Sequence, residues 1–214
     1  TAFTKEVIDK LPYSTYVGFT PSENIFTSTD IDVSSIVNKM KFILIHTPDI
    51  DMNIIEIKNG EKVLVPISND YLQGFFNKCT HKIDEPIQLK CGKDLATLYL
   101  GFNDSISSRY FSSSVNTIDV KSGTHQSIIE STLREFIQQR IESKKVYAKK
   151  EDAMVGSRTF CILNVCNPAF GGQVKHSLDM KPDELRDLLD KRKITKYLEN
   201  NIEFVDKWIE YTEQ

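Results

Sequence analysis

The stretch Thr159–Leu178, which reads TFCILNVCNPAFGGQVKHSL, joins a dense apolar run to a polar loop. The apolar part, Thr159–Cys166, is typical of a strand buried in a sheet. In the loop, the Gly-Gly pair permits backbone conformations closed to other residues, so the chain can turn sharply and approach a ligand closely. Gln173 offers a neutral donor and acceptor, and Lys175 a point charge, a pair that suits a phosphate. The same residue types are also common in a solvated turn without function.

Three further segments extend the pattern of this loop. In chain order they read STYVGFTP (Ser14–Pro21), LYLGFND (Leu98–Asp104) and FSSSVNTIDVKSGTH (Phe111–His125). Together with the loop they resemble the ATPase subunit of type IIA DNA topoisomerases, the family of gyrase B, whose loop carries a Gln-Thr-Lys motif. The first segment is similar to the last strand of that ATPase domain. The other two are similar to the strands and the Gly-Thr-His turn that open the main helix of the transducer domain.

The resemblance covers nearly the whole chain and implies an α+β fold in three parts. Residues 1–78 would complete a GHKL-type ATPase α/β sandwich, residues 79–180 would form a ribosomal S5-like transducer domain, and residues 181–214 would be C-terminal transducer helices. The Gly-Gly pair fits a T-even-like phage large subunit better than bacterial gyrase. Because the chain has no initiator Met and begins where the ATPase domain would end, we expect a fragment.

The resemblance also implies the roles of individual residues. Lys175 would be catalytic and contact the γ-phosphate of ATP, while Gln173 would bind a phosphate oxygen or steady the loop. Thr15 and Val17 match positions at the base pocket, although plain strand residues are an equally open interpretation. Val174 stands where the family has Thr, so any hydrogen bond from that hydroxyl is lost, while the two outer residues of the motif remain.

ATP with Mg²⁺ is the implied cofactor, with metal ligands outside this chain. The sequence contains no DxGxG, no GxxGxG and no recognisable general-base Glu. We therefore expect one part of an ATP-hydrolysing type II DNA topoisomerase, a part that lacks the main ATPase motifs. It would couple ATP binding and hydrolysis to closure of a dimeric gate around a DNA duplex. The implied partners are double-stranded DNA, the rest of the ATPase domain, the DNA-cleaving subunit or region, and a second copy of the subunit.

Lys144, Lys145, Lys149 and Lys150 form a cluster at and beyond the end of the helix that begins at the Gly-Thr-His turn. Charge runs usually mark solvated faces. In the resembled family the transducers line a cavity that admits DNA, so these lysines become candidate phosphate contacts, independent of base sequence and sensitive to salt. The alternative function is a non-enzymatic S5-like nucleic-acid-binding or scaffold protein, which would explain both the lysines and the missing ATPase motifs.

The net charge of −3 gives no overall basic signature, so a nucleic-acid contact must come from a local patch. No apolar run approaches the roughly 20 residues that cross a bilayer. Cys79, Cys91, Cys161 and Cys166 contain no CxxC pair, and we expect them to be reduced in an intracellular protein. That protein would be cytoplasmic, in the host cytoplasm for a phage, or nuclear for a eukaryote. The four scattered histidines predict no metal site.

Periodicity and capping signals predict the remaining elements. Strands are expected at Ser14–Thr20, Ile87–Cys91, Leu95–Phe102 and Ser108–Val120, with a hairpin formed by Met52–Ile57 and Lys62–Ile67 around Asn59-Gly60. Helices are expected at Ile31–Thr47, Asn69–Phe76, Pro182–Asp190 and Lys193–Tyr211. A further long helix is expected to have Thr124 as its N-cap and an apolar face made of Ile128, Ile129, Leu133, Phe136, Ile137 and Ile141.

Overall fold

The computed structural model describes residues 15–25, 27–28, 30–58, 60–145 and 153–212 of the 214. Its internal contacts divide the chain after Ile36 into two units, residues 1–36 and residues 37–214. The expected domain boundaries after Lys78 and after Met180 both fall inside the second unit and stay predictions.

In the first unit, the predicted strand Ser14–Thr20 is wrong over its described residues, because 15–20 adopt no regular structure. Its alternating pattern is genuine, but Val17 and Phe19 are 83% and 70% exposed. A strand is stabilised by pairing its backbone groups with a neighbour and by burying one face. Val17 and Phe19, which would share one face of the strand, bury no such face.

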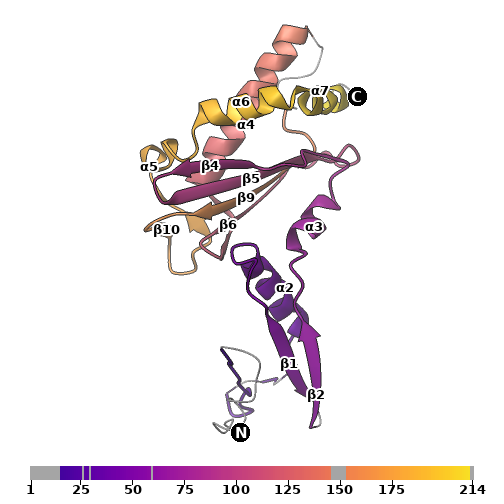
Figure 1. Ribbon diagram of the computed structural model, residues 1–214, viewed down its shortest axis with the longest axis vertical. Helices are drawn as coiled ribbons and strands as arrows, with labels where there is room; N and C mark the ends of the chain where they lie inside the picture. The colour runs from indigo at the N-terminus through magenta and orange to yellow at the C-terminus, as the bar shows by residue number, and fades with distance from the viewer. Residues whose placement is uncertain (1–14, 26, 29, 59, 146–152, 213–214) are drawn as a thin grey trace. The chain divides into compact units, whose positions relative to one another are not determined.

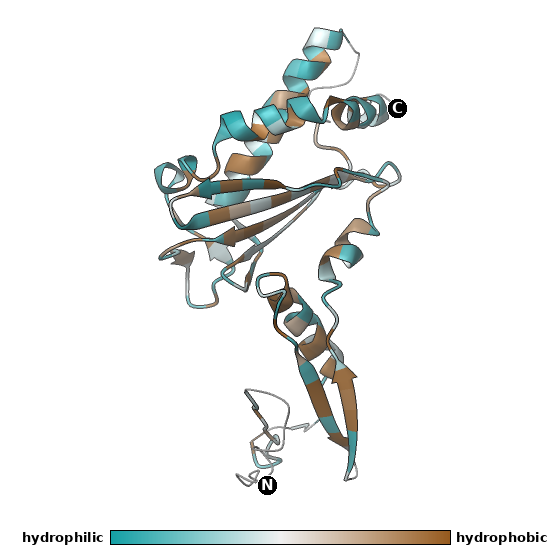
Figure 2. Ribbon diagram, in the orientation of Figure 1, coloured by the Kyte–Doolittle hydropathy of each residue, from teal (hydrophilic) through white to brown (hydrophobic). Residues whose placement is uncertain are grey.

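The elements up to residue 76 follow the sequence closely. Helix α2 spans Val33–Leu44, strands β1 (Asn53–Lys58) and β2 (Glu61–Pro66) form the expected antiparallel hairpin, and α3 spans Tyr71–Phe76. Lys58 pairs with Glu61, and Gly60 has a φ of 82°, as a two-residue hairpin turn demands. Figure 2 shows this hairpin largely in the colour of hydrophobic residues.

One sheet organises the second unit. Its strands are β3 (His81–Lys82), β4 (Ile87–Cys91), β5 (Asp94–Phe102), β6 (Tyr110–Val115), β7 (Ile118–Val120) and β9 (Ser157–Asn164). They lie in the order β3-β5-β9-β6-β7, with β4 also paired to β5. Figure 1 labels four of these strands, β4, β5, β9 and β6. The predicted apolar strand is therefore β9, in the middle of the sheet, antiparallel to β5 and parallel to β6.

Strand β9 is buried from Ser157 to Leu163 because both of its faces are covered. Cys161 and Leu163 belong to the larger core, which the C-terminal helices share. Phe160 and Ile162 belong to a second cluster with Phe42, Phe75 and their neighbours. Alternate residues of a strand point to opposite faces, so α2 and α3 supply one cover and the C-terminal helices the other.

The helical cover on the larger core consists of α4 (Thr124–Lys144), α5 (Pro182–Arg186), α6 (Lys191–Asn200) and α7 (Ile202–Thr212). Helices α4 and α6 lie on the same side of the sheet in Figure 1. Helix α4 buries the predicted face, with Ile129, Leu133, Ile137 and Ile141 inside and Ile128 and Phe136 partly buried. The expected α+β class is confirmed.

Two long elements predicted as continuous are each broken in the structure. The strand expected at Ser108–Val120 is a hairpin, because Asn116 and Thr117 have φ values of 48° and 70° and turn the chain back from β6 to β7. The helix expected at Lys193–Tyr211 is interrupted at Asn201, the C-cap of α6, whose side chain donates to the Tyr197 carbonyl at 2.8 Å. Asn side chains compete with the backbone for hydrogen bonds, which favours turns and helix ends.

Thr124 is not the N-cap of α4. The N-cap is Gly123, with a φ of 142° and no side-chain cap, and Thr124 is the first helical residue. Cys79, Cys91, Cys161 and Cys166 are all free, as expected; Cys161 is buried and Cys166 is exposed. Among the described residues, we find no helix with the length and apolar character needed to span a membrane.

Candidate functional site

The Gln173–Lys175 loop is the tip of a small hairpin. Strands β10 (Phe170–Gly171) and β11 (Ser177–Leu178) pair in an antiparallel manner, and the chain turns between them. Gly172 has a φ of 74° and Lys175 a φ of 55°, and the Lys175 amide donates to the Gly172 carbonyl at 3.4 Å. The glycine therefore meets a conformational requirement of the turn, as the sequence predicted.

Gly123 holds this loop against the start of α4. Strand β8 (Ser122–Gly123) runs parallel to β11, with Leu178 opposite Gly123, and the Lys121 amide donates to the His176 carbonyl at 2.9 Å. A Cβ atom on Gly123 would lie 2.3 Å from the Leu178 carbonyl oxygen. The Gly-Thr-His turn and the Gln-x-Lys loop, some fifty residues apart in sequence, thus lie side by side because a glycine permits the approach.

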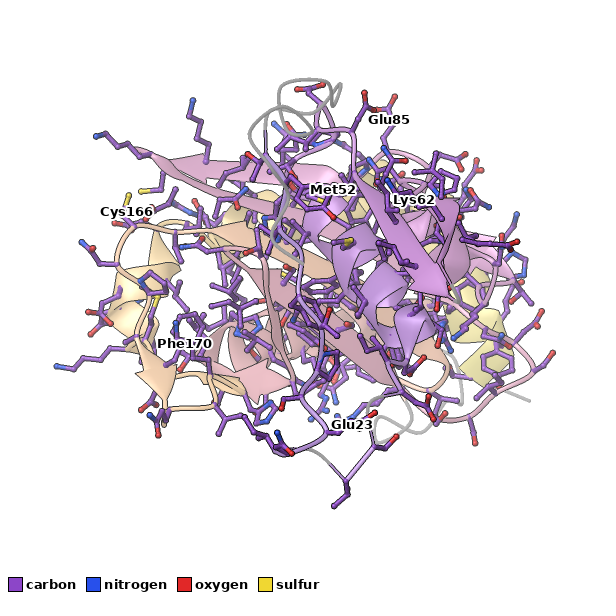
Figure 3. All side chains as sticks on the ribbon, turned by 90° about the horizontal axis from the view of Figure 1, so that it is seen from below. Glu23, Met52, Lys62, Glu85, Cys166 and Phe170 are labelled. Atoms are coloured by element: carbon purple, nitrogen blue, oxygen red, sulfur yellow. The ribbon has the colours of Figure 1, made fainter. Side chains whose placement is uncertain are left out.

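The side chains of Gln173, Val174 and Lys175 are exposed. The Lys175 ammonium lies 5.5 Å from the centre of the Phe170 ring, and Phe170, labelled in Figure 3, packs against the core. Among the described residues, no carboxylate forms an ion pair with Lys175. The ammonium is therefore a solvated cation at the tip of an anchored loop, which suits an incoming phosphate.

His125, the last residue of the Gly-Thr-His turn, ties the start of α4 to strand β6. It is fully buried, and its Nε2 lies 2.7 Å from the Ser113 hydroxyl, which itself donates to the Val120 carbonyl at 2.8 Å. Because the hydroxyl proton of Ser113 points at the Val120 carbonyl, the hydroxyl oxygen accepts from Nε2, which therefore carries the imidazole proton. Nδ1 has no hydrogen-bond partner among the described residues. Burial lowers the pKa of His125 from 6.5 to about 4. The imidazole is neutral and structural, a role the sequence did not reveal.

Two of the predicted nucleotide contacts lie in the first unit. Thr15 and Val17 are exposed and belong to the segment without regular structure. Their expected place on a strand is therefore not observed, and their assignment to a base pocket stays a prediction.

The predicted lysine cluster is divided. Lys144 ends α4 and forms an ion pair with Asp206 of α7 at 2.7 Å, beside a two-pronged hydrogen bond from Arg140 to the same carboxylate. Lys145 follows in a left-handed conformation and is exposed. Lys149 and Lys150 lie outside the described residues. Lys144 is thus held in an ion pair within the protein, whereas Lys145 takes no part in the contacts with Asp206.

No group of three or more His, Cys, Asp or Glu side chains able to hold a metal ion is found among the described residues. The donors present at the loop, an amide and an ammonium, fit phosphate oxygens rather than a cation.

Comparison with known proteins gives the family. The family model described as DNA gyrase B matches residues 65–213. A curated relative, the DNA gyrase B protein of Thermotoga maritima, is 25% identical over 186 residues, which is 78% of this chain and 29% of the relative.

Solved structures share the fold. The 43K ATPase domain of Thermus thermophilus gyrase B, in complex with an aminocoumarin, superimposes with a TM-score of 0.61 at 13% identity. The topoisomerase IV ATP-binding domain of Francisella tularensis, in complex with a small-molecule inhibitor, gives 0.61 at 18% identity. Each alignment covers 90% of this chain and 55% of the other. The chain therefore spans about half of these domains and less than a third of the curated relative.

Proposed function

Because the chain belongs to the DNA gyrase B family, we propose that it supplies the end of the ATPase domain and the S5-like transducer domain of an ATP-dependent type II DNA topoisomerase. In this proposal it couples ATP binding and hydrolysis to closure of a gate around a DNA duplex. The whole subunit acts as a homodimer with the DNA-cleaving subunit or region, in the cytoplasm. An origin in a T-even-like phage remains a prediction from the Gly-Gly pair.

Lys175 is the catalytic residue of this proposal. It contacts the γ-phosphate of ATP that the rest of the ATPase domain holds, and a cation there stabilises the charge that develops during phosphoryl transfer. The supporting observation is the solvated ammonium on a loop whose base is fixed to α4 through Gly123. Gln173, two residues away, supplies a neutral donor to a phosphate oxygen. Mg²⁺ accompanies the nucleotide and is held by residues outside this chain.

The same contact explains the coupling. A ligand shifts an equilibrium between two arrangements only if it interacts unequally with them. The Lys175 contact exists while the γ-phosphate is present and disappears after hydrolysis and release, so the loop reports the state of the nucleotide to the transducer. Since α4 begins next to the loop, it is the element that would carry this change.

The test is ATP hydrolysis by the intact subunit. We expect Lys175→Ala to lower kcat by about a hundredfold or more while nucleotide binding changes little, because the contact acts mainly in the transition state. Lys90→Ala, which removes an exposed lysine at the end of β4, is the matched control and should keep full activity. Wild-type turnover in Lys175→Ala would remove the catalytic assignment. The comparisons lend no support to the non-enzymatic scaffold alternative.

A further inference from the structure

A pocket with a volume of about 430 Å³ opens on the sheet face that α2 and α3 cover. Its walls come from both helices, from the segment after α3 and from strands β6 and β9. The aromatic rings of Phe75, Tyr110 and Phe160 form its apolar lining. The centre of the Phe75 ring lies 5.7 Å from that of Phe160 and 6.2 Å from that of Tyr110. None of its lining residues belongs to the Gln173–Lys175 loop.

Arg158 is the unusual residue of this pocket. It is the second residue of β9, and only 7% of it is exposed. Its Nε has no hydrogen-bond partner among the residues that the structure describes, and its guanidinium lies 4.8 Å from the centre of the Tyr110 ring. Within the described part of the chain, no carboxylate pairs with it. Burying a guanidinium without an anion costs free energy. An anionic ligand that enters the pocket would remove this cost.

The other charged groups of the pocket leave a surplus of positive charge. Lys41 lies 2.8 Å from Asp70, which also accepts a hydrogen bond from Ser68 at 2.8 Å. Lys78 is exposed and forms no ion pair with a described residue. The lining thus holds three cationic side chains, Lys41, Lys78 and Arg158, against the single carboxylate of Asp70. That carboxylate is already occupied by Lys41, which leaves Arg158 and Lys78 for an incoming anion.

We propose that this pocket binds a small organic anion whose carboxylate or phosphate group pairs with Arg158. The planar fork of a guanidinium matches the two oxygens of either group. The aromatic lining suits a ligand with an apolar body next to its charge. The side-chain amides of Gln73 and Asn77, which also line the pocket, can donate to further oxygens. The site goes beyond the proposed function and shares no residue with it.

The first experiment measures binding to the 1–214 chain by isothermal titration calorimetry. The probes are benzoate, phenyl phosphate, inorganic phosphate and uncharged benzyl alcohol. We expect benzoate or phenyl phosphate to bind the wild type at least tenfold more tightly than benzyl alcohol, and whichever binds better identifies the anionic group. Inorganic phosphate should bind more weakly than phenyl phosphate, because it lacks the apolar body.

Arg158→Met keeps an apolar stem and removes the charge. We expect Arg158→Met to raise the Kd of the anion at least tenfold. Arg186→Met, at an exposed arginine of α5, should leave this Kd unchanged. Without ligand, Arg158→Met should melt at or above the wild-type Tm, because an unpaired buried charge is gone. The anion should raise the Tm of the wild type and leave that of Arg158→Met unchanged.

Lys78→Gln tests the same pocket at an exposed position, where the substitution should not affect folding. It should raise the Kd of the anion severalfold, whereas Lys90→Gln should leave the Kd unchanged. In the wild type, the Nε–Hε resonance of Arg158 should shift on addition of benzoate or phenyl phosphate. Anions that bind no tighter than benzyl alcohol, or that bind Arg158→Met as well as the wild type, would overturn the proposal. The readouts do not use ATP hydrolysis, so failure here is distinct from failure of the Lys175 assignment.

Discussion

His125 shows how a single buried side chain makes stability depend on pH. The folded protein holds the imidazole neutral, since a second proton would place a charge on the unpartnered Nδ1 in an apolar surrounding. The pKa of His125 therefore drops from 6.5 to about 4 on folding. Below pH 6.5 His125 is protonated in the unfolded chain but stays neutral in the folded chain until about pH 4. The free energy of unfolding therefore falls as the pH falls.

We predict a loss of up to about 3 kcal/mol from this residue between pH 6.5 and pH 4. His125→Gln keeps a donor for Ser113 and removes the titration, so its free energy of unfolding should depend less steeply on pH over that interval. Denaturant unfolding of wild type and variant at a series of pH values measures the difference.

His176→Gln is the control for this prediction, because His176 is exposed. Its pH dependence should equal that of the wild type. Burial also lowers the pKa of His46, and that contribution should persist in His125→Gln. Equal slopes for His125→Gln and the wild type would show that His125 is not held neutral in the folded state.

At the scale of elements, the junction of β8 and β11 depends on one missing side chain. Gly123→Ala would place a Cβ atom 2.3 Å from the Leu178 carbonyl oxygen, at a φ of 142° that L side chains rarely adopt. The loop and the start of α4 would have to separate. We expect a loss of roughly 2–4 kcal/mol in the free energy of unfolding, measured by denaturant unfolding of the 1–214 chain.

Gly74→Ala is the matched control within the same chain. Gly74 lies in α3, and a Cβ atom there would meet nothing within 4 Å. Alanine favours the helix, so the change should be neutral or stabilising by up to about 1 kcal/mol. A Gly123→Ala chain as stable as the Gly74→Ala chain would mean that β8 and β11 do not need their close approach.

The elements that sequence predicted well are those whose signals are local. Strand β9 and the buried face of α4 follow from apolar spacing alone. The turn at Asn116 has no local signal, because it depends on a residue that is distant in sequence. The Asn116 side chain donates to the Val165 carbonyl at 2.8 Å and accepts from the Val165 amide at 2.9 Å. Those bonds hold a left-handed conformation that no window around residue 116 reveals.

At the scale of the whole molecule, the parts of the candidate site were predicted but not their assembly. The Gly-Thr-His turn and the Gln-x-Lys loop are separate motifs in the sequence, and the β8–β11 pairing that joins them is a property of the fold. No local signal distinguishes Arg158, because it precedes the apolar run and resembles the polar end of an ordinary strand. A charged residue that shares the burial of β9 can be recognised only once the covering helices are placed.

The lysine cluster illustrates the same limit and gives the last prediction. Asp206 lies some sixty residues after Lys144 in sequence, yet it binds both Lys144 and Arg140, and these bonds lower the pKa of its carboxyl group. Because the Lys144 ammonium already forms an ion pair with the Asp206 carboxylate, a DNA phosphate would have to compete with that carboxylate. If this part of the chain touches DNA, the contact should come from Lys145, Lys149 and Lys150.

Salt dependence of DNA binding by the whole subunit separates these lysines. The slope of log K against log salt falls by about 0.9 for each phosphate that the protein no longer neutralises. Replacing Lys145, Lys149 and Lys150 together by Gln should therefore reduce it by up to about 2.7. Lys144→Gln should change the slope much less, and Lys90→Gln not at all. An unchanged slope in the triple variant would show that the cluster is a solvated helix end, and a large effect of Lys144→Gln would mean that DNA displaces Asp206.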